Sequence, residues 1–301
     1  MPVKHILSTV LLLAAAFSVC AEPSTQWHFL GEGKNNAISG ITSIDGEHFL
    51  VAIDGRKPEH PRLALLTWKK SQKPALNLLD WCDKNNPPVD LEAVTAIPNH
   101  QESRPKYREY LLLESKGSVT RIQLENNNSC KVTAKFDLPN AVADSNMEAI
   151  AIHCFGSSCL LAWAERGDDK TPAKLSWAHF NIEDNQLDEP ENKPFEFKAP
   201  FPQQNLRSIS DLAIDSKGEI WVSASSDPGD EGPYSSAIYH LGSFVQRENH
   251  IDLNVAKEIK PLARYEKENV KIEGLVFTPE GLLMGVENEN LGGKVAILPI
   301  K

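Results

Sequence analysis

Five short stretches of the sequence share one pattern, in which a Ser or Glu lies between an apolar residue and a small or short one, with an aliphatic residue next. The polar position recurs every 53 to 63 residues. If the fold brings these positions together, their carboxylates repel one another unless they are protonated or neutralised by a cation. Carboxylate and hydroxyl oxygens suit Ca²⁺ better than zinc or copper. The predicted calcium ligands are Ser39, Glu92, Glu148, Ser210 and Glu273.

A second set of acidic residues lies at the end of the apolar run that follows each stretch. Its members are Asp54, Glu114, Glu165, Asp227 and Glu287, and basic residues such as Arg56, Lys116 and Arg166 accompany them. Beside a cation, arginine would hold a phosphoryl group and a carboxylate would orient water, which is the chemistry of phosphate ester hydrolysis. The alternative for each residue is an ion pair on a solvated face. The predicted catalytic residues are Asp54, Glu114, Glu165, Arg166 and Glu287.

The elements that would position these residues are strands. Each stretch is followed by a turn, a second and a third apolar strand, and the first four repeats also have a fourth. Such β-rich repeats predict an all-β, five-bladed β-propeller with four-stranded blades, whose first strands line the axis. Residues 26–31 would supply the fourth strand of the last blade and close the ring. A sixth blade within 183–207 is an alternative, and 251–259 is predicted as a short helix.

The order Ser, Glu, Glu, Ser, Glu, one per blade, resembles the central calcium site of the calcium-activated nucleotidase (apyrase) propellers. The amino-acid sequence of the blades, as in IEGLVFTPEGLLMGVENE and DLEAVTAI, is similar to that of the esterase-like phytase and SdiA-regulated bacterial propellers. Both resemblances extend from about Gln26 to Ile300. The first implies calcium ligation by the five ring residues. A water-filled channel lined by polar side chains is the alternative.

The N-terminus has the pattern of a secretory signal peptide. Lys4 precedes the apolar run from Ile6 to Phe17, and Val19 and Ala21 fit a cleavage site after Ala21. We therefore expect a signal peptide over 1–21, one propeller domain over 22–301 and a secreted or periplasmic location, with a lipoprotein at Cys20 as an alternative. No later segment is apolar enough to cross a membrane.

The four cysteines outside the predicted signal indicate two disulfides, with three possible pairings. Cys154 and Cys159 flank Phe155-Gly156-Ser157-Ser158, which is typical of a hairpin turn, so a local bond is favoured. Cys82 and Cys130 would then form the other bond.

The composition limits the possible partners. The formal net charge of -10 argues against nucleic acid, which requires a basic surface. GxSxG, HExxH, phosphate-loop and EF-hand motifs are missing. The favoured function is a monomeric calcium-dependent phosphoesterase for a nucleotide, phytate-like or other phosphate ester. A non-catalytic propeller that binds an envelope or protein ligand around a structural calcium is the main alternative, and a lactonase or sugar-binding propeller ranks last.

Overall fold

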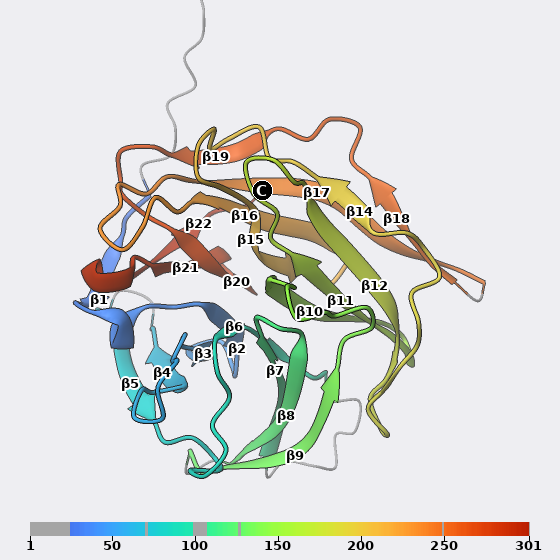
Figure 1. Cartoon of the computed structure of the whole chain (residues 1–301), viewed down its shortest axis with the longest axis horizontal. Helices are drawn as coiled ribbons and strands as arrows, with labels where there is room; N and C mark the ends of the chain where they lie inside the picture. The colour runs from blue at the N-terminus through green and yellow to red at the C-terminus, as the bar shows by residue number, and fades with distance from the viewer. Residues whose placement is uncertain (1–24, 70–71, 99–106, 126–127, 249, 301) are drawn as a thin grey trace, which may run out of the picture.

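The computed structural model describes residues 25–69, 72–98, 107–125, 128–248 and 250–300. The predicted signal segment, with Cys20, lies outside these residues. The described chain forms five antiparallel sheets that follow one another around a common centre in chain order, as the colours of Figure 1 show. The prediction of an all-β, five-bladed propeller is therefore confirmed. No described helix is both long and apolar enough to span a bilayer.

The blades are built from consecutive strands. Blade 1 contains β2 (Gly40–Ser43), β3 (His48–Ala52), β4 (Leu63–Thr67) and β5 (Ala75–Leu79). Blade 2 contains β6 (Leu91–Ala96), β7 (Tyr107–Glu114), β8 (Ser118–Glu125) and β9 (Cys130–Asp137). Blade 3 contains β10 (Met147–Phe155), β11 (Ser158–Glu165), β12 (Ala173–Asn181), β13 (Gln186–Leu187) and β14 (Phe195–Phe197). Blade 4 contains β15 (Leu206–Ile214), β16 (Glu219–Ser226), β17 (Ser236–Arg247), β18 (His250–Val255) and β19 (Pro261–Tyr265).

Blade 5 joins the two ends of the described chain. It contains β20 (Ile272–Thr278), β21 (Gly281–Glu287), β22 (Gly293–Leu298) and β1 (His28–Gly31). β1 pairs with β22 in antiparallel register, with His28 opposite Val295. This pairing is the ring closure predicted from the sequence, and it covers an edge that would otherwise be free. Two single 3-10 turns, η1 (Lys34–Asn36) and η2 (Glu289–Leu291), lie beside the closure.

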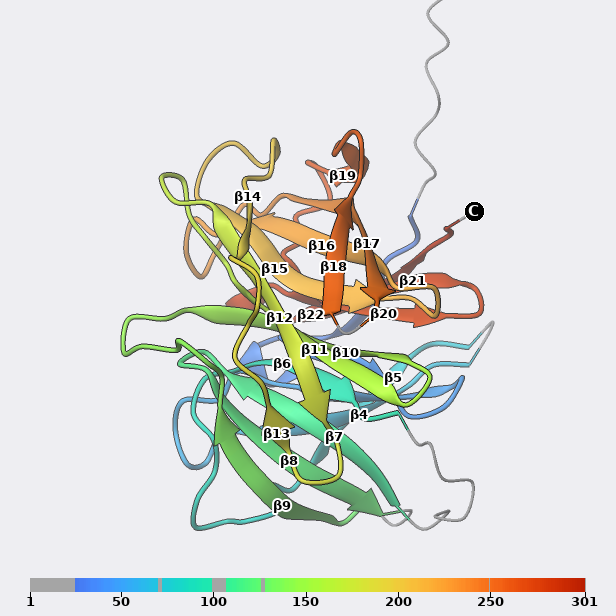
Figure 2. The same cartoon turned by 90° about the vertical axis from the view of Figure 1, so that its right-hand side faces the viewer.

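Two expectations about the outer strands are corrected. The segment 183–207 contains β13 and β14, which both pair with β12, so it does not hide a sixth blade; Figure 2 shows them along different parts of β12. The predicted helix over 251–259 was wrong, because most of it belongs to β18. Ile251, Leu253 and Val255 alternate with polar residues at the strand period, and β18 pairs along the long strand β17.

The core is divided into layers between neighbouring blades. The five inner strands β2, β6, β10, β15 and β20 contact one another in sequence, and β20 contacts β2. The apolar residue two positions after each predicted ring residue is buried between blades. These residues are Ile41, Val94, Ile150, Leu212 and Leu275. Side chains also bind the backbone of the next blade: Thr42 Oγ1 accepts from the Ala96 N–H at 3.1 Å, and Asp211 Oδ2 accepts from the Leu275 N–H at 2.6 Å. These contacts fix the inner strands that carry the ring.

Both predicted disulfides are present. Cys82–Cys130 joins the outer edges of blades 1 and 2, and Cys154–Cys159 links opposite positions of β10 and β11. Two disulfides are typical of a protein in an oxidising compartment.

Candidate functional site at the mouth of the propeller axis

Four of the predicted ring residues lie on inner strands and Ser39 directly precedes β2, on the face of the propeller where these strands begin and the second strands end. We call this the mouth face. All five are buried, at no more than 8% exposure. Ser39, Glu148 and Glu273 take part in a connected set of polar contacts. Glu92 and Ser210 have no hydrogen bond or ion pair with another side chain of the described chain, and the Ser210 hydroxyl is a buried group without a partner.

Lys271 lies in the middle of this cluster, and its side chain is 0% exposed. Its Nζ is 2.9 Å from Glu287 Oε2, 2.8 Å from Glu289 Oε1, 3.5 Å from Glu273 Oε2 and 3.9 Å from Asp227 Oδ2. Burial lowers the pKa of Lys271, but the surrounding carboxylates outweigh it and raise that pKa well above its usual value. The ammonium is therefore a permanent positive charge at the axis.

Arg207 is a second cation built into the ring. Its Nη1 lies 3.0 Å from Glu273 Oε1 and 3.6 Å from Glu148 Oε2, and its Nη2 binds Asp227. Arg166 Nη1 is 3.3 Å from the other oxygen of Glu148. Burial opposes the charge of Arg207, yet Glu148, Glu273 and Asp227 raise its pKa. Glu148 and Glu273 thus already face guanidinium groups.

The donor set does not fit a calcium ion shared by the five ring residues. Ca²⁺ takes six to eight oxygen ligands at about 2.3–2.6 Å, whereas Lys271 and Arg207 stand between the ring carboxylates. The Ser39 hydroxyl already donates to Glu287 Oε1 at 2.7 Å. Within the described residues, no group of three or more His, Cys, Asp or Glu side chains could hold a metal ion. Calcium binding therefore stays a prediction from the sequence, and no step of the chemistry below depends on it.

The second acidic set divides into two parts. Asp54, Asp227 and Glu287 join the buried cluster. Ser39 links two of them, because its Oγ accepts from the Asp54 N–H at 3.0 Å while it donates to Glu287. Glu114 and Glu165 lie apart: Glu114 Oε2 accepts from the Val89 N–H at 2.9 Å, and Glu165 is 3.7 Å from Lys174. The repeat pattern predicts the same role for these two as for Asp54 and Glu287, but in the structure they bind neighbouring groups of their own.

The carboxyl groups around Ser39 have opposite pKa shifts. Burial, with the charges of Glu287 and Asp90, raises the pKa of Asp54 to about 7. Burial also acts on Glu287, but Lys271 and hydrogen bonds from its neighbours, Ser39 among them, outweigh it and lower the pKa of Glu287. Burial and the charges of Glu148, Glu287 and Asp54 raise the pKa of Glu92 well above its usual value. One mouth thus holds a carboxylate that stays ionised and a carboxyl that titrates near neutral pH.

Arg166 and Arg207 border a cavity of about 190 Å³ on the mouth face. Gly167, Asp168, Asp169, Asn205, Leu206 and Asp227 complete its lining. Arg166 is the more accessible of the two, with a side chain 31% exposed against 16% for Arg207. Arg166 has a single ion pair, and the Asn146 side-chain oxygen, in the amide orientation that satisfies both groups, also accepts from its Nε and Nη2. Because it is the more exposed of the two arginines, it is the better placed to bind a ligand in this cavity.

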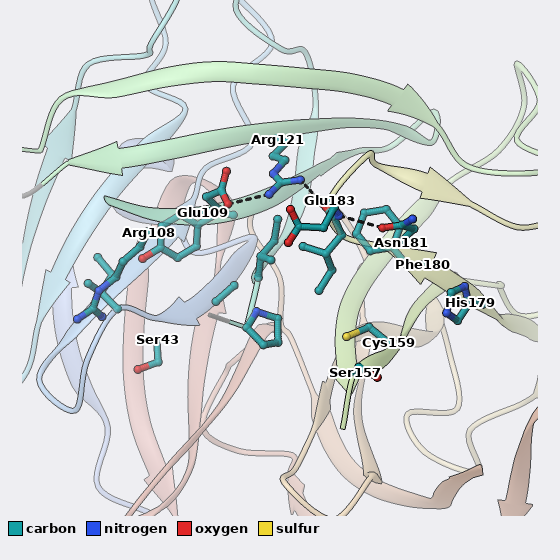
Figure 3. A pocket seen from close by; sticks show the side chains of 16 residues that line it. Ser43, Arg108, Glu109, Arg121, Ser157, Cys159, His179, Phe180, Asn181 and Glu183 are labelled. Atoms are coloured by element: carbon teal, nitrogen blue, oxygen red, sulfur yellow. Dashed lines mark hydrogen bonds and ion pairs between the residues drawn. The ribbon is translucent and has the colours of Figure 1, made fainter. Parts of the chain in front are cut away.

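A larger cavity of about 730 Å³ lies at the other end of the inner strands, between blades 1, 2 and 3. Figure 3 shows Arg121 on its wall, bound to Glu109 with 2.7 Å between Nη2 and Oε2. Arg121 Nη1 also donates to the Ile182 carbonyl and to Asn185 Oδ1, so it fastens blade 3 to blade 2. None of the predicted site residues lines this cavity.

Sequence reasoning missed three charged residues of the mouth: Lys271, Asp90 and Glu289. A signal for two of them was present, because Asp90 and Lys271 each precede a ring residue by two positions. Asp90 directly precedes β6 and Lys271 directly precedes β20. Extending the repeated pattern by two positions toward the N-terminus would have included both residues. Glu289 lies in η2 and has no such signal.

Comparison with known proteins places the chain by fold alone. No protein-family model matches the sequence, and no curated protein matches it. Among solved structures, the chain is similar to the catalytic domain of a GH62 α-L-arabinofuranosidase from Coprinopsis cinerea (TM-score 0.51, 12% identity, covering 91% of this chain and 96% of that chain). It is also similar to an exo-1,5-α-L-arabinanase from a bovine ruminal metagenomic library (TM-score 0.52, 9% identity, covering 90% and 95%). Neither is a phytase or a nucleotidase.

Proposed function

We propose that the mouth face is a hydrolytic site for a small phosphate ester. The observation that carries this proposal is that Ser39 links Glu287, through its carboxylate, to Asp54, through its backbone N–H, and that the carboxyl groups of these two neighbours have opposite pKa shifts. Glu287 remains ionised and helps to raise the pKa of Asp54 to about 7. A carboxyl that titrates near the working pH is suited to general acid catalysis, and a neighbour with a different protonation state is how such a group is tuned.

The cavity beside Arg166 and Arg207 supports the phosphate ester as substrate. Guanidinium groups bind phosphoryl oxygens in a bidentate fashion and stabilise the charge on them during transfer. Arg166 would bind the phosphoryl group directly, because it is the more exposed of the two. Arg207 is held by Glu148, Glu273 and Asp227, so it would contribute its charge and its position.

Hydrolysis of the ester requires one titrating group, Asp54. The oxygen of a water molecule forms a bond to phosphorus as the bond to the ester oxygen breaks. Protonated Asp54 gives its proton to the leaving oxygen, which departs as an alcohol. One proton of the water restores Asp54 through solvent, and the other stays on the product phosphate. Glu287 acts on Asp54 through its charge and is a positioning residue.

Phosphate release tests this function. The purified chain is incubated with small phosphate monoesters and with p-nitrophenyl carboxylate esters, as wild type and as the variants Asp54→Asn and Arg166→Gln. We expect phosphate release, with kcat/KM lower by about 10²-fold in Asp54→Asn. Asp230→Asn, an exposed acid on the same face, is the matched control and should retain activity. No release by the folded wild type would reject the function, and release unaffected by Asp54→Asn would reject the role of Asp54.

A further substrate in the panel separates two hydrolytic chemistries. The similar solved structures include an arabinofuranosidase and an arabinanase, so p-nitrophenyl arabinofuranoside is added. Cleavage of this glycoside without phosphate release would assign the carboxyl pair to glycoside hydrolysis. No turnover of any substrate would favour a propeller that only binds its ligand.

A further inference from the structure

Glu92 is the ring glutamate that has no close ion pair among the described residues, although Arg56 and Arg207 lie near enough to feel its charge. Each of the other two ring glutamates has two cationic partners: Arg166 and Arg207 for Glu148, and Arg207 and Lys271 for Glu273. The Glu92 side chain has no ion pair or hydrogen bond with any described residue, although Glu92 is only 8% exposed. A buried carboxylate without a partner is costly. The chain therefore leaves one acceptor of the ring open.

A second open acceptor lies in the neighbouring blade. Asp54 Oδ1 is buried and has no hydrogen-bond partner in the described chain. The other oxygen of Asp54 lies 3.5 Å from Arg56 Nε, and that nitrogen is held more closely by Asp90, at 2.6 Å. Blades 1 and 2 therefore hold carboxyl groups with unused acceptor capacity at the mouth, which we call the acidic sector; Asp54 Oδ1 is enclosed by protein, so Glu92 is the member offered to a ligand.

The chemistry of these acceptors selects one kind of cation. No described group of three or more His, Cys, Asp or Glu side chains could hold a metal ion. A protonated amine needs only hydrogen-bond acceptors at about 2.7–3.2 Å, which separate carboxyl groups can supply one by one. The acidic sector therefore suits an ammonium group.

The two halves of the mouth face differ in charge. Arg166 and Arg207 border the 190 Å³ cavity at blades 3 and 4. The acidic sector belongs to blades 1 and 2, across the ring of inner strands. We propose that the substrate is a phosphate ester of an amino alcohol, with its phosphate at Arg166 and its ammonium group at Glu92. This inference rests on the proposed function and names the substrate class of that site.

Two esters that differ only in the cation test the inference by binding alone. O-phosphoethanolamine carries the ammonium group, and 2-hydroxyethyl phosphate has a hydroxyl in its place. Isothermal titration of the wild-type chain should give a Kd at least about tenfold lower for O-phosphoethanolamine, since one charge-assisted hydrogen bond contributes on this scale. Glu92→Gln should remove the difference and leave the affinity for 2-hydroxyethyl phosphate within about twofold.

A matched variant and an independent readout complete the experiment. Glu231→Gln also removes one carboxylate from the same face, but Glu231 is exposed and contacts Asn290, so the preference for the amine should persist. Equal affinities of the wild type for the two esters, or binding of neither, would overturn the inference. Amine preference that depends on Glu92 without any hydrolysis would support it while rejecting the proposed function. Hydrolysis of both esters without a preference for the amine would overturn the inference and support the proposed function.

Discussion

Lys271 Nζ lies 2.9 Å from Glu287 Oε2, and both side chains are at most 8% exposed. This pair anchors the centre of the mouth, because Lys271 also contacts Glu273 and Glu289, and Glu287 also accepts from Ser39. The chain thus carries its own counter-ion beside Glu273, one of the five residues that the sequence predicts as metal ligands. A buried charge of this kind is fixed only while all its partners are present.

Replacing Lys271 tests how strongly the cluster depends on that cation. Lys271→Met leaves Glu273, Glu287 and Glu289 without their shared ammonium group, and we expect a loss of about 3–5 kcal/mol in the free energy of unfolding. Denaturant unfolding followed by fluorescence measures it. Lys260→Met, at an exposed position, should change stability by no more than about 0.5 kcal/mol. The double variant Lys271→Met with Glu287→Gln should recover part of the loss, and no recovery would show that the cost comes from packing.

The effect of Ca²⁺ on thermal stability distinguishes a calcium-binding ring, which the sequence predicts, from a ring neutralised by Lys271 and Arg207, which the contacts in the structure indicate. Because Lys271 and Arg207 already neutralise Glu148 and Glu273, we expect the thermal unfolding of the wild type to be the same with Ca²⁺ and with chelator. In Lys271→Met the released carboxylates are free to bind Ca²⁺. At a Ca²⁺ concentration of 100 times Kd, this binding would add about 2.7 kcal/mol to the free energy of unfolding. Differential scanning calorimetry measures both. A clear rise of the wild-type Tm with Ca²⁺ would restore the calcium ring of the sequence prediction.

Asp54 should make stability depend on pH in the acid-to-neutral range. Its pKa of about 7 in the folded chain is above the usual value of 3.8, so the folded state keeps a proton that the unfolded state releases between these values. The contribution of Asp54 to stability therefore falls as pH rises from about 4 to 7. Asp54→Asn removes this term, and its Tm relative to wild type should rise over the same window and then level off. The limit is about 4 kcal/mol, because one pKa unit corresponds to about 1.4 kcal/mol. A Tm difference independent of pH would contradict the shift.

Gly40 tests the crowding of the inner strands. A Cβ at this position would lie 2.7 Å from the Ala93 Cα and 2.9 Å from the Val94 nitrogen, both backbone atoms of the next blade. Gly40→Ala should therefore force blades 1 and 2 apart and cost about 1–3 kcal/mol. Gly46→Ala is the control, since a Cβ there meets nothing within 4 Å. Equal chemical-denaturation midpoints for the two variants would show that the inner strands are not tightly packed at this contact.

Much of the fold could be predicted because each blade is specified by short sequence patterns within itself. The phrases around Glu92, Glu148 and Glu273 repeat at blade length, and alternation along each strand identifies the buried face. The fourth strand of the last blade was found by noting that the C-terminal repeat lacks one and that residues 26–31 could supply it. The helix predicted over 251–259 failed because a strand alternating at period two was read at the helical period. Pairing with β17 decided between them.

The composition of the axis was determined by the sequence, and its electrostatics by the tertiary structure. Repeat spacing placed Ser39, Glu92, Glu148, Ser210 and Glu273 on or directly before inner strands, and all five are buried there. Which of them have a cation depends on contacts between distant residues: Ser39 binds Glu287 across 248 positions, and Arg207 reaches Glu273 across 66. A pattern within one blade cannot encode such contacts, because they form only when different blades pack against one another. This packing gave Glu148 and Glu273 internal partners and left Glu92 without an ion pair among the described residues.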